Sequence, residues 1–301
     1  MASPAIENII LSYPGAEVNF IGTESSLGIY KNHPSCNKTF LVNKNYFELY
    51  HLSKKIKKVD IFFTFRSSLR SKIFSLFIGA DFRFLFSKKK YIKGHQVEKY
   101  NDFVNQSLGI NLEASQLIVH KSQQEIYRKK FFKKTIGLNP GASYGDAKCW
   151  PLSHYIELSV KISNDYEIVL LGSANEARLT RKIQNGAIEN NVKQIHDFAG
   201  RTSINDLINI VSELDILITG DSGTMHLAAA FNIPTIAIFG PTDSSSTSQW
   251  KNKNSVILSR NLECQPCMKR SCPLLHHNCM KSINPDEVID AIMNIDKKEV
   301  L

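Results

Sequence analysis

The chain has 301 residues, 43% of them hydrophobic, which is enough apolar material for two domains of ordinary size. It carries 37 Lys and Arg against 28 Asp and Glu, a formal net charge of +9. No apolar run reaches the roughly 20 residues of a membrane-spanning helix, and no secretory signal pattern opens the chain. We therefore expect a cytoplasmic protein without a transmembrane segment, and six reduced cysteines rather than a disulfide scaffold.

The first half of the chain opens on a helix. Ser3 and Pro4 begin a predicted helix that ends near residue 13, and a Pro-Gly turn leads to a strand over 16–22. Further strands are predicted over 38–43, 59–65 and 81–86, with helices between them. A Rossmann-like domain normally starts with a strand that is central in its sheet. The first domain is therefore predicted to be Rossmann-like but to lack its first strand.

The second half alternates strand and helix regularly. Helices are predicted from Ser153, Asn175, Ser203 and Ser222, and a terminal helix from Asn284. The strands between them are predicted over 135–139, 166–172, 193–198, 214–220 and 234–240. This alternation is typical of a doubly wound parallel sheet in an α/β fold. We predict two domains, 1–134 and 135–301.

The positive charge is concentrated in the first of these domains. Residues 1–134 hold 22 Lys and Arg against 10 Asp and Glu, a net +12, whereas residues 135–301 hold 15 against 18, a net −3. Basic runs occur at 54–58, 87–93 and 128–134, and each alone is typical of a solvated surface. The asymmetry favours an anionic partner for the first half: nucleic acid, acidic lipid or an anionic saccharide.

A strand-to-helix loop in the second half combines small and polar residues. In GDSGTMHLAAA (220–230), Asp221 and Gly223 flank Ser222, a good N-cap for the helix that follows. Free amide groups and the positive dipole end at a helix N-terminus favour a phosphate. Asp221 then has to grip sugar hydroxyls or orient a lysine, and His226 is either a ligand or a satisfied core histidine.

A second loop follows the predicted strand 135–139 and contains Ser143, Tyr144, Asp146 and Lys148. Its small residues let backbone amides approach a ligand, and Lys148 can neutralise a diphosphate, although a single loop lysine is usually just solvated. Glu176 is a candidate for ribose hydroxyls or an ordinary first-turn glutamate. Because carboxyl ends of parallel strands meet at one sheet edge, the two loops are predicted to form one site.

Four cysteines and two histidines lie close together in CQPCMKRSCPLLHHNC (264–279). A CxxC pair with two further thiols can hold structural zinc. The spacing is tight and irregular and matches no paired-knuckle pattern, so reduced thiols that shape a loop remain the alternative.

Together these motifs resemble glycosyltransferase family 9, the heptosyltransferases of lipopolysaccharide core synthesis. The resemblance rests on NPGASYGDAKCWP (139–151), GDSGTMHLAAA (220–230), FGPTD (239–243) and the cysteine stretch, which is similar to that of type II members. It implies a GT-B fold of two Rossmann-like domains, with the nucleotide sugar on the C-terminal domain and the acceptor on the N-terminal one.

The resemblance also implies the chemistry. The donor substrate would be ADP-L-glycero-D-manno-heptose, with no separate cofactor and no metal. The acceptor would be an anionic heptosyl-Kdo2-lipid A at the cytoplasmic face of the inner membrane, where the protein would be peripheral. Lys148 and Asp221 would be catalytic, with Lys148 stabilising the leaving diphosphate. The candidate donor-binding residues are Ser143, Tyr144, Glu176, Ser222, Gly223, Thr224, His226 and Gly240.

One departure from the family pattern concerns the catalytic base. Family members begin with a strand and a Gly-Asp pair whose Asp is the expected base, and Met1 falls just after that place. We therefore expect a late-started chain with little transferase activity whose donor domain still folds and binds ADP. The predicted function is inverting, metal-independent heptosyl transfer. The alternative is a catalytically impaired ADP-sugar-binding protein.

Two other function classes are disfavoured. A nucleic-acid-binding protein would leave the 220–243 motif unexplained, and the sequence contains no recognition module of that kind. A dehydrogenase would need a Gly-x-Gly-x-x-Gly after a predicted strand, and the sequence has none.

Overall fold

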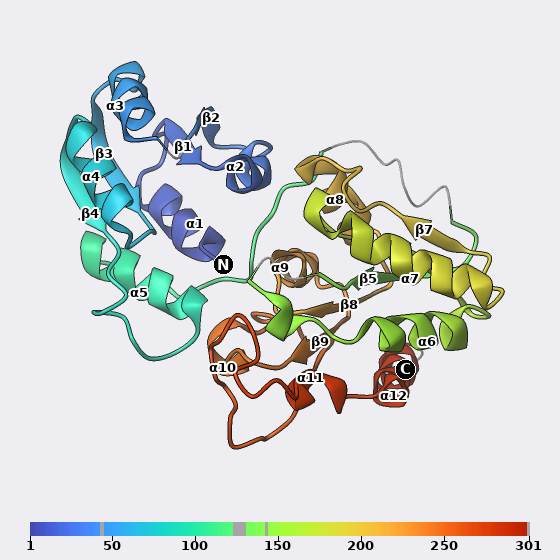
Figure 1. Ribbon diagram of the computed structural model, residues 1–301. Helices are drawn as coiled ribbons and strands as arrows, with labels where there is room; N and C mark the ends of the chain where they lie inside the picture. The colour runs from blue at the N-terminus through green and yellow to red at the C-terminus, as the bar shows by residue number, and fades with distance from the viewer. Residues whose placement is uncertain (43–44, 123–130, 142–143, 300–301) are drawn as a thin grey trace. The chain divides into compact units, whose positions relative to one another are not determined.

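The computed structural model describes residues 1–42, 45–122, 131–141 and 144–299 (Figure 1). The chain forms two compact units, Met1–His120 and Lys121–Leu301. The predicted domain boundary after residue 134 lies 14 residues further along, inside the first strand of the second unit. Among the described residues, no helix combines the length and the apolar character that crossing a bilayer requires.

A six-stranded parallel sheet forms the centre of the second unit, in the order β10-β9-β8-β5-β6-β7. The chain runs from β5 outward through β6 to β7, then returns to the other side of β5 and continues through β8, β9 and β10. The direction of winding therefore reverses between β5 and β8, which is where doubly wound sheets bind ligands. The strands are β5 (Lys134–Asn139), β6 (Tyr166–Leu170), β7 (Ile195–Asp197), β8 (Ile216–Gly220), β9 (Thr235–Phe239) and β10 (Ser255–Ser259).

Helices cover both faces of this sheet (Figure 1). Helix α6 (Leu152–Ile162) packs against α7 (Ala177–Glu189) and α12 (Pro285–Glu299), and α8 (Ile204–Ser212) packs against α9 (Gly223–Ala230). Successive strand residues alternate between the two faces. On one face, the main apolar cluster contains Ile136, Leu138, Ile168, Leu170, Ile218 and Ile238. Ala237 and Phe239 pack instead with Met225 of α9.

Local capping explains where several of these helices begin. Ser203 accepts an N–H from Asp206 and receives the Asp206 carboxylate on its own N–H, which confirms the predicted capping box of α8. Ser222 accepts an N–H from Met225 and caps α9 as predicted. Helix α6 instead begins at Leu152 after Pro151, so the predicted cap Ser153 lies inside its first turn.

The described residues of the first unit form four strands in two separate parallel pairs. Strand β1 (Val18–Gly22) pairs with β2 (Cys36–Leu41), and β3 (Val59–Thr64) pairs with β4 (Ala80–Leu85). Within the described part of the chain no ladder joins β1 to β3. This break agrees with the prediction of a sheet without its central strand. Apolar side chains cross the break, since Ile21 of β1 and Phe62 of β3 belong to one cluster.

Five helices surround these strands: α1 (Ser3–Ser12), α2 (Glu24–Tyr30), α3 (Tyr46–Lys55), α4 (Leu69–Phe77) and α5 (Gln96–Leu108). Helix α1 packs against α5, where the buried Asn8 amide donates to Asn101 at 2.8 Å. Helix α3 packs against α4. The inner faces of α3 and α4 contribute Leu49 and Phe74 to the core, so their outer faces are left toward solvent.

Candidate functional site

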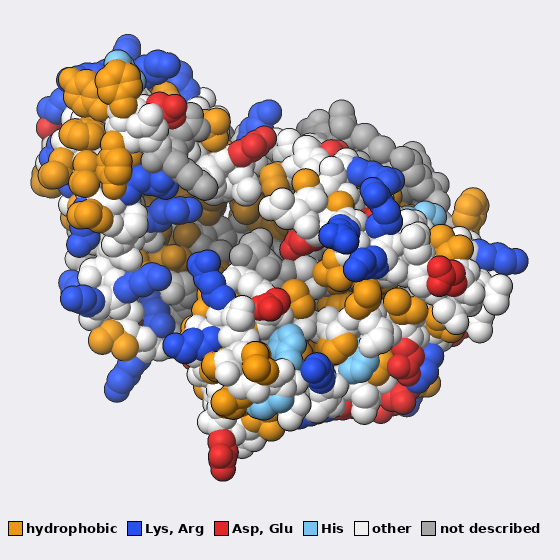
Figure 2. Space-filling view, viewed as in Figure 1, with side chains coloured by type: hydrophobic (Ala, Val, Ile, Leu, Met, Phe, Trp, Pro, Cys, Tyr) orange, Lys and Arg blue, Asp and Glu red, His pale blue; other side chains and the backbone are white. Residues whose placement is uncertain are grey.

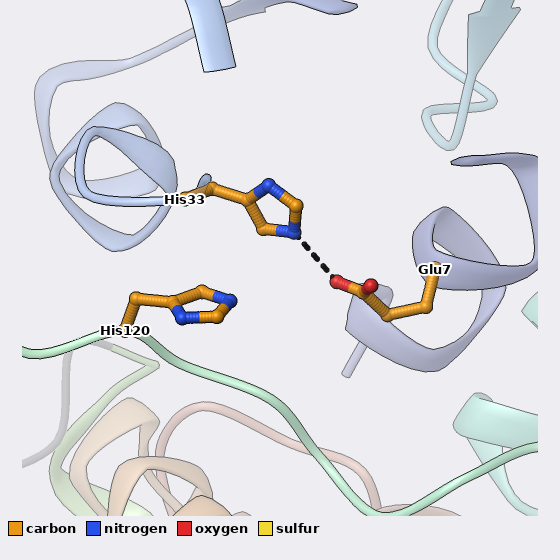
Figure 3. Close-up of side chains that lie close together, drawn as sticks. All are labelled: Glu7, His33 and His120. Carbon is orange, nitrogen blue, oxygen red and sulfur yellow. Dashed lines mark hydrogen bonds and ion pairs between the residues drawn. The ribbon is translucent and has the colours of Figure 1, made fainter. Parts of the chain in front are cut away.

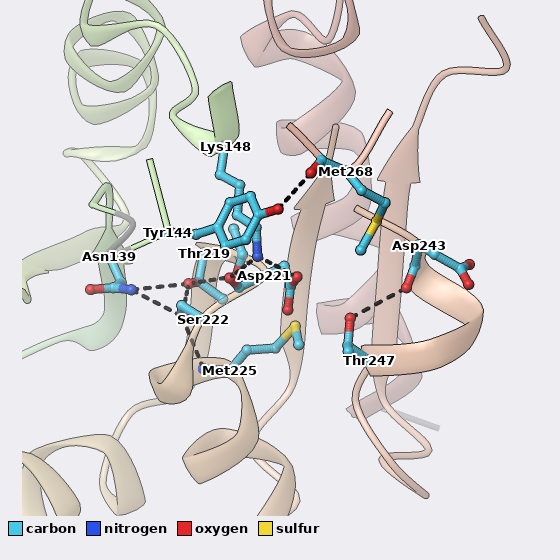
Figure 4. Close-up of polar contacts among 11 residues, drawn as sticks. Asn139, Tyr144, Lys148, Thr219, Asp221, Ser222, Met225, Asp243, Thr247 and Met268 are labelled. Atoms are coloured by element: carbon cyan, nitrogen blue, oxygen red, sulfur yellow. Dashed lines mark hydrogen bonds and ion pairs between the residues drawn. The ribbon is translucent and has the colours of Figure 1, made fainter. Parts of the chain in front are cut away.

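A buried polar network joins the ends of β5 and β8 at the point where the winding reverses (Figure 4). The Asn139 side-chain amide donates to the Thr219 hydroxyl at 3.2 Å and to the Ser222 hydroxyl at 3.1 Å. The two hydroxyl oxygens lie 2.9 Å apart, and both Asn139 and Thr219 are buried. These contacts fix Ser222, and with it the N-terminus of α9, against the end of the neighbouring strand.

Lys148 and Asp221 form a buried ion pair beside this network. Lys148 is the last residue of a short 3-10 helix, Asp146–Lys148. Its Nζ lies 2.5 Å from the Asp221 carboxylate and 3.2 Å from the Asp221 carbonyl oxygen. The two side chains are only 9% and 10% exposed. Removing charges from water is costly unless they are paired, so the two side chains hold each other in place. The structure thus brings together the two residues predicted to be catalytic.

Tyr144 lies against this ion pair. Lys148 Nζ lies 4.7 Å from the centre of the Tyr144 ring, and the Arg270 guanidinium lies 5.5 Å from it. The Tyr144 hydroxyl donates to the Met268 carbonyl at 2.7 Å, which fixes the ring (Figure 4). A cation over an aromatic face is stabilised by the ring quadrupole. Tyr144 therefore helps to hold Lys148, and Arg270 adds a second positive charge that the sequence did not single out.

The cysteine stretch supports the Lys148 turn from outside. Ala147 donates its N–H to the Arg270 carbonyl at 3.0 Å, and His277 Nε2 donates to the Ala147 carbonyl at 2.8 Å. A Cβ on Gly145 would lie 2.3 Å from the Arg270 carbonyl oxygen, so that approach requires glycine. The residue before Lys148 is thus held through both of its backbone groups.

The four cysteines of this stretch line one small cavity together with His276 and His277. Its volume of about 20 Å³ leaves room for one water molecule. Burial, and then the three neighbouring thiols, raise the pKa of Cys279. All four cysteines are free. The stretch shapes one wall of the site, and structural zinc and reduced thiols both stay predictions for it.

The other predicted donor-binding residues lie around the same sheet edge. Glu176 accepts the Ser173 N–H at 2.6 Å and its carboxylate lies against Gly141, where a Cβ would be 2.0 Å away. The first turn of α9 contains Gly223, which is exposed, and Thr224, which is buried. His226 is half-buried and its Nδ1 atom is buried, so the ligand and the satisfied core histidine both stay predictions. Ser143 lies outside the described residues.

Gly240 has a packing role. A Cβ at this position would lie 2.4 Å from the Met280 sulfur and 3.1 Å from the Cys279 sulfur. Both of these residues belong to α11 (Asn278–Lys281) and are buried. Gly240 thus allows the end of β9 to contact α11, whether or not it also touches a donor.

A second polar cluster, which the sequence did not predict, lies in the first unit (Figure 3). One ligand atom from each of Glu7, His33 and His120 falls within 4.8 Å of the others, a separation that suits one metal ion. The Ser35 N–H donates to His33 Nδ1 at 3.1 Å, so Nε2 carries the proton and donates it to Glu7 at 2.7 Å. A metal would have to replace that proton. As folded, the His33–Glu7 pair is satisfied by its own hydrogen bond.

Burial and the adjacent His33 lower the pKa of His120, with Glu7 opposing the shift. His120 is therefore neutral at pH 7. The three residues come from separate segments with no characteristic spacing, so nothing in the sequence indicates that they meet.

A cavity of about 270 Å³ lies at the opposite edge of the six-stranded sheet. It is lined by the start of β5 and by Glu213 and Asp215, which precede β8. Ligands of doubly wound sheets bind at the carboxyl ends of strands, so we do not assign the functional site to this cavity.

Comparison with known proteins identifies the family of the chain. A family model described as glycosyltransferase family 9 (heptosyltransferase) matches residues 50–277. The chain is 36% identical over 307 residues to lipooligosaccharide heptosyltransferase 2 of Campylobacter jejuni, covering 100% of this chain and 95% of that protein.

Solved structures share the fold at lower sequence identity. ADP-heptose LPS heptosyltransferase II of E. coli gives a TM-score of 0.82 at 20% identity and covers 100% of this chain and 95% of its own. The structure of E. coli heptosyltransferase WaaC with ADP gives a TM-score of 0.73 at 16% identity, and the match covers 98% of this chain and 95% of that chain. These likenesses confirm the predicted GT-B type of α/β fold. The chain is a glycosyltransferase and belongs to glycosyltransferase family 9, the heptosyltransferases.

Proposed function

We propose that this protein transfers L-glycero-D-manno-heptose from ADP-heptose to the heptosyl-Kdo2-lipid A inner core of lipopolysaccharide or lipooligosaccharide, with inversion and without a metal ion. The observation that carries the proposal is the buried Lys148–Asp221 pair at the N-terminus of α9, where the winding of the sheet reverses. The names of two relatives, lipooligosaccharide heptosyltransferase 2 and ADP-heptose LPS heptosyltransferase II, support the acceptor class and the donor.

The site has the charges that a leaving nucleoside diphosphate needs. The first N–H groups of a helix have no hydrogen-bond partner within the helix. In α9 the Ser222 hydroxyl accepts the N–H of Met225. The N–H groups of Gly223 and Thr224 and the ammonium group of Lys148 then stabilise the negative charge that develops as the glycosidic bond breaks. Positive charge at this place supplies what a divalent cation supplies in other transferases, and this supports the metal-independent form of the proposal.

Asp221 has a defined part in this arrangement. A carboxylate beside a diphosphate repels it, but here one carboxylate oxygen lies 2.5 Å from Lys148 Nζ. Asp221 therefore orients Lys148 until the donor arrives. The basic first unit would meet the anionic acceptor, since residues 1–134 carry a net charge of +12.

The test is heptosyl transfer by the full chain, followed by mass spectrometry of a heptosyl-Kdo2-lipid A acceptor with ADP-heptose as donor. Lys148→Ala should lower kcat by roughly 10²- to 10³-fold, the usual cost of removing one group that stabilises transition-state charge. Lys182→Ala, an exposed lysine on α7, is the matched control. Activity should survive EDTA.

The outcomes separate the proposal from its alternative. Transfer that is lost in Lys148→Ala but retained in Lys182→Ala supports the proposed activity. ADP binding without transfer in the unaltered chain would instead favour a catalytically impaired ADP-sugar-binding protein. Transfer that stops in EDTA and returns with a divalent cation would contradict the metal-independent mechanism.

A further inference from the structure

The face formed by α3 and α4 of the first unit exposes several large apolar side chains. Phe47 on α3 and Leu69 and Leu76 on α4 expose 69%, 69% and 76% of their surface. Tyr50 and Phe77 are also exposed. Figure 2 shows hydrophobic side chains gathered over these two helices. Scattered apolar residues are normal on a protein surface, but a contiguous group marks an interaction site.

Direct contacts make these side chains one surface. The rings of Tyr50 and Phe77 meet edge to face with their centres 5.5 Å apart. The rings of Phe47 and His51 also meet edge to face, with their centres 4.3 Å apart. Helical spacing sets Phe47, Tyr50 and Lys54 on one stripe of α3, because they are three and four residues apart. The same spacing sets Leu69, Lys72 and Leu76 on one stripe of α4.

Positive charge is interleaved with these apolar residues. Lys54 Nζ lies 5.2 Å from the centre of the Tyr50 ring, and Lys72 lies between Leu69 and Leu76 on α4. Residues 45–83 hold eight Lys and Arg against three Asp and Glu, a net +5. One of those acids, Asp81, is already paired with Lys58 at 2.5 Å.

We propose that this α3–α4 face docks on an anionic phospholipid bilayer. Phe47, Tyr50, Leu69 and Leu76 enter the interface, and Lys54 and Lys72 reach the lipid phosphates. Tyrosine suits the boundary because one end of its ring is apolar and the other polar, and lysine buries its stem while its ammonium stays in water. Apolar and basic residues on the same helix face are the pattern of interfacial membrane helices, whereas an acidic protein partner would not need the aromatic residues.

This inference deepens the proposed function, because a lipid-anchored acceptor has to be reached at a membrane surface. The docking test nevertheless uses neither donor nor acceptor, so vesicle binding and heptosyl transfer succeed or fail separately.

The experiment is co-sedimentation of the full chain with vesicles of an equal mixture of phosphatidylglycerol and phosphatidylcholine, and with vesicles of phosphatidylcholine alone. The chain should bind the anionic vesicles, less strongly as salt increases. The double variant Phe47→Ser/Leu76→Ser should weaken binding at least about tenfold, since two exposed side chains lose their apolar insertion. Lys54→Gln/Lys72→Gln should weaken binding by roughly 25-fold, because each lysine contributes about fivefold.

The matched control is Ile188→Ser/Lys182→Gln on α7 of the second unit, where both residues are exposed. It should bind vesicles as the unaltered chain does. Circular dichroism of each variant checks that it is folded. Two results would overturn the proposal: no association of the unaltered chain with anionic vesicles, or equal binding by the α3–α4 variants and the control. A dimer in solution that Phe47→Ser/Leu76→Ser converts to monomer, without vesicle binding, would assign this face to a second copy instead.

Discussion

Asp221 shows how a single carboxylate can serve a site built for an anion. Its side chain is about nine-tenths buried, and its close partner is Lys148 Nζ. In the proposed reaction, a diphosphate that approaches α9 would meet a lysine that is already oriented, but it would also meet a nearby carboxylate. The residue therefore acts through Lys148, and its removal should affect rate and donor affinity differently.

We expect Asp221→Asn to lower kcat for heptosyl transfer while ADP binds no more weakly than to the unaltered chain. Asn keeps the shape of the side chain but releases Lys148 from its charged partner, so the lysine is misplaced during bond cleavage, although the repulsion on ADP is also removed. The same change should lower the free energy of unfolding by about 2–4 kcal/mol, because Lys148 stays buried without a counter-charge. Steady-state kinetics, calorimetric ADP titration and urea unfolding measure the three effects. A weakened ADP Kd with unchanged kcat would make Asp221 a donor ligand instead.

At the same scale, the sequence pointed to the charged and capping residues that meet at this sheet edge, and missed the residues that hold them. Lys148, Asp221 and Ser222 stand out because charged and capping residues follow short buried strands. Asn139 and Thr219 do not, because each looks like an ordinary strand-end residue and their contact spans 80 positions. Contacts between non-adjacent segments depend on the order of strands in the sheet, which residue pattern alone does not specify.

At the scale of elements, the end of β9 and the short helix α11 meet at Gly240. We expect Gly240→Ala to lower the free energy of unfolding by about 1–3 kcal/mol, because its Cβ would overlap the buried Met280 and Cys279 side chains. Gly223→Ala is the informative comparison, since no atom lies within 4 Å of a Cβ placed there.

That second variant should unfold at the same urea concentration as the unaltered chain, so a change in its ADP affinity reports on the ligand alone. If the two glycine variants have the same free energy of unfolding, the contact between β9 and α11 contributes less to stability than its packing indicates.

A polar clamp joins β10 to α12 across the cysteine stretch. Arg260, directly after β10, donates to the Ser282 carbonyl at 2.7 Å and to the Glu287 carboxylate, and the Asn284 N–H also donates to Glu287. The hydrogen bond from Arg260 is the largest cause of a lowered pKa for Glu287. A carboxylate with a lowered folded-state pKa stabilises the fold above its unfolded pKa, and the stabilisation is lost as pH falls.

Glu287→Gln should therefore cost about 0.5–1 kcal/mol at pH 7, the range for a partly exposed ion pair. The difference from the unaltered chain should shrink as pH falls below about 4.3, the ordinary glutamate value. Thermal unfolding across pH measures it. Glu189→Gln, an exposed glutamate at the end of α7, should show no such dependence. A difference that stays constant from pH 7 to acid would assign the effect to packing.

Elements whose start is encoded locally were predicted well, and elements that depend on neighbours were not. The capping box at Ser203 and the cap at Ser222 fix α8 and α9 from within a few residues. The edge strand β10 and the four-residue helix α11 have no such signal. Strand β10 forms because β9 offers an unpaired edge, and α11 is held by Trp150, whose indole N–H reaches the Ile283 carbonyl just beyond it.

At the scale of the whole molecule, the two units differ in how their sheets are completed. In the second unit every strand of the six-stranded sheet pairs with its neighbours in one continuous ladder, and a single large apolar cluster covers one face. In the first unit two strand pairs are joined by side-chain packing alone among the described residues. A continuous sheet with its own core is the usual condition for a domain to fold independently.

We therefore expect the fragment 121–301 to fold on its own and to bind ADP. Lys148, Asp221, Ser222 and the cysteine stretch all lie within it, and the contacts that hold Lys148 come from the same fragment. ADP should bind with a Kd within about threefold of that of the full chain, a difference below 1 kcal/mol. A single cooperative urea transition and calorimetric titration would establish both properties. The fragment should transfer no heptose, because the acceptor is assigned to the first unit. A fragment that folds cooperatively but does not bind ADP would place part of the donor site in residues 1–120, and would count against a nucleotide site built from the β5 and β8 loops alone.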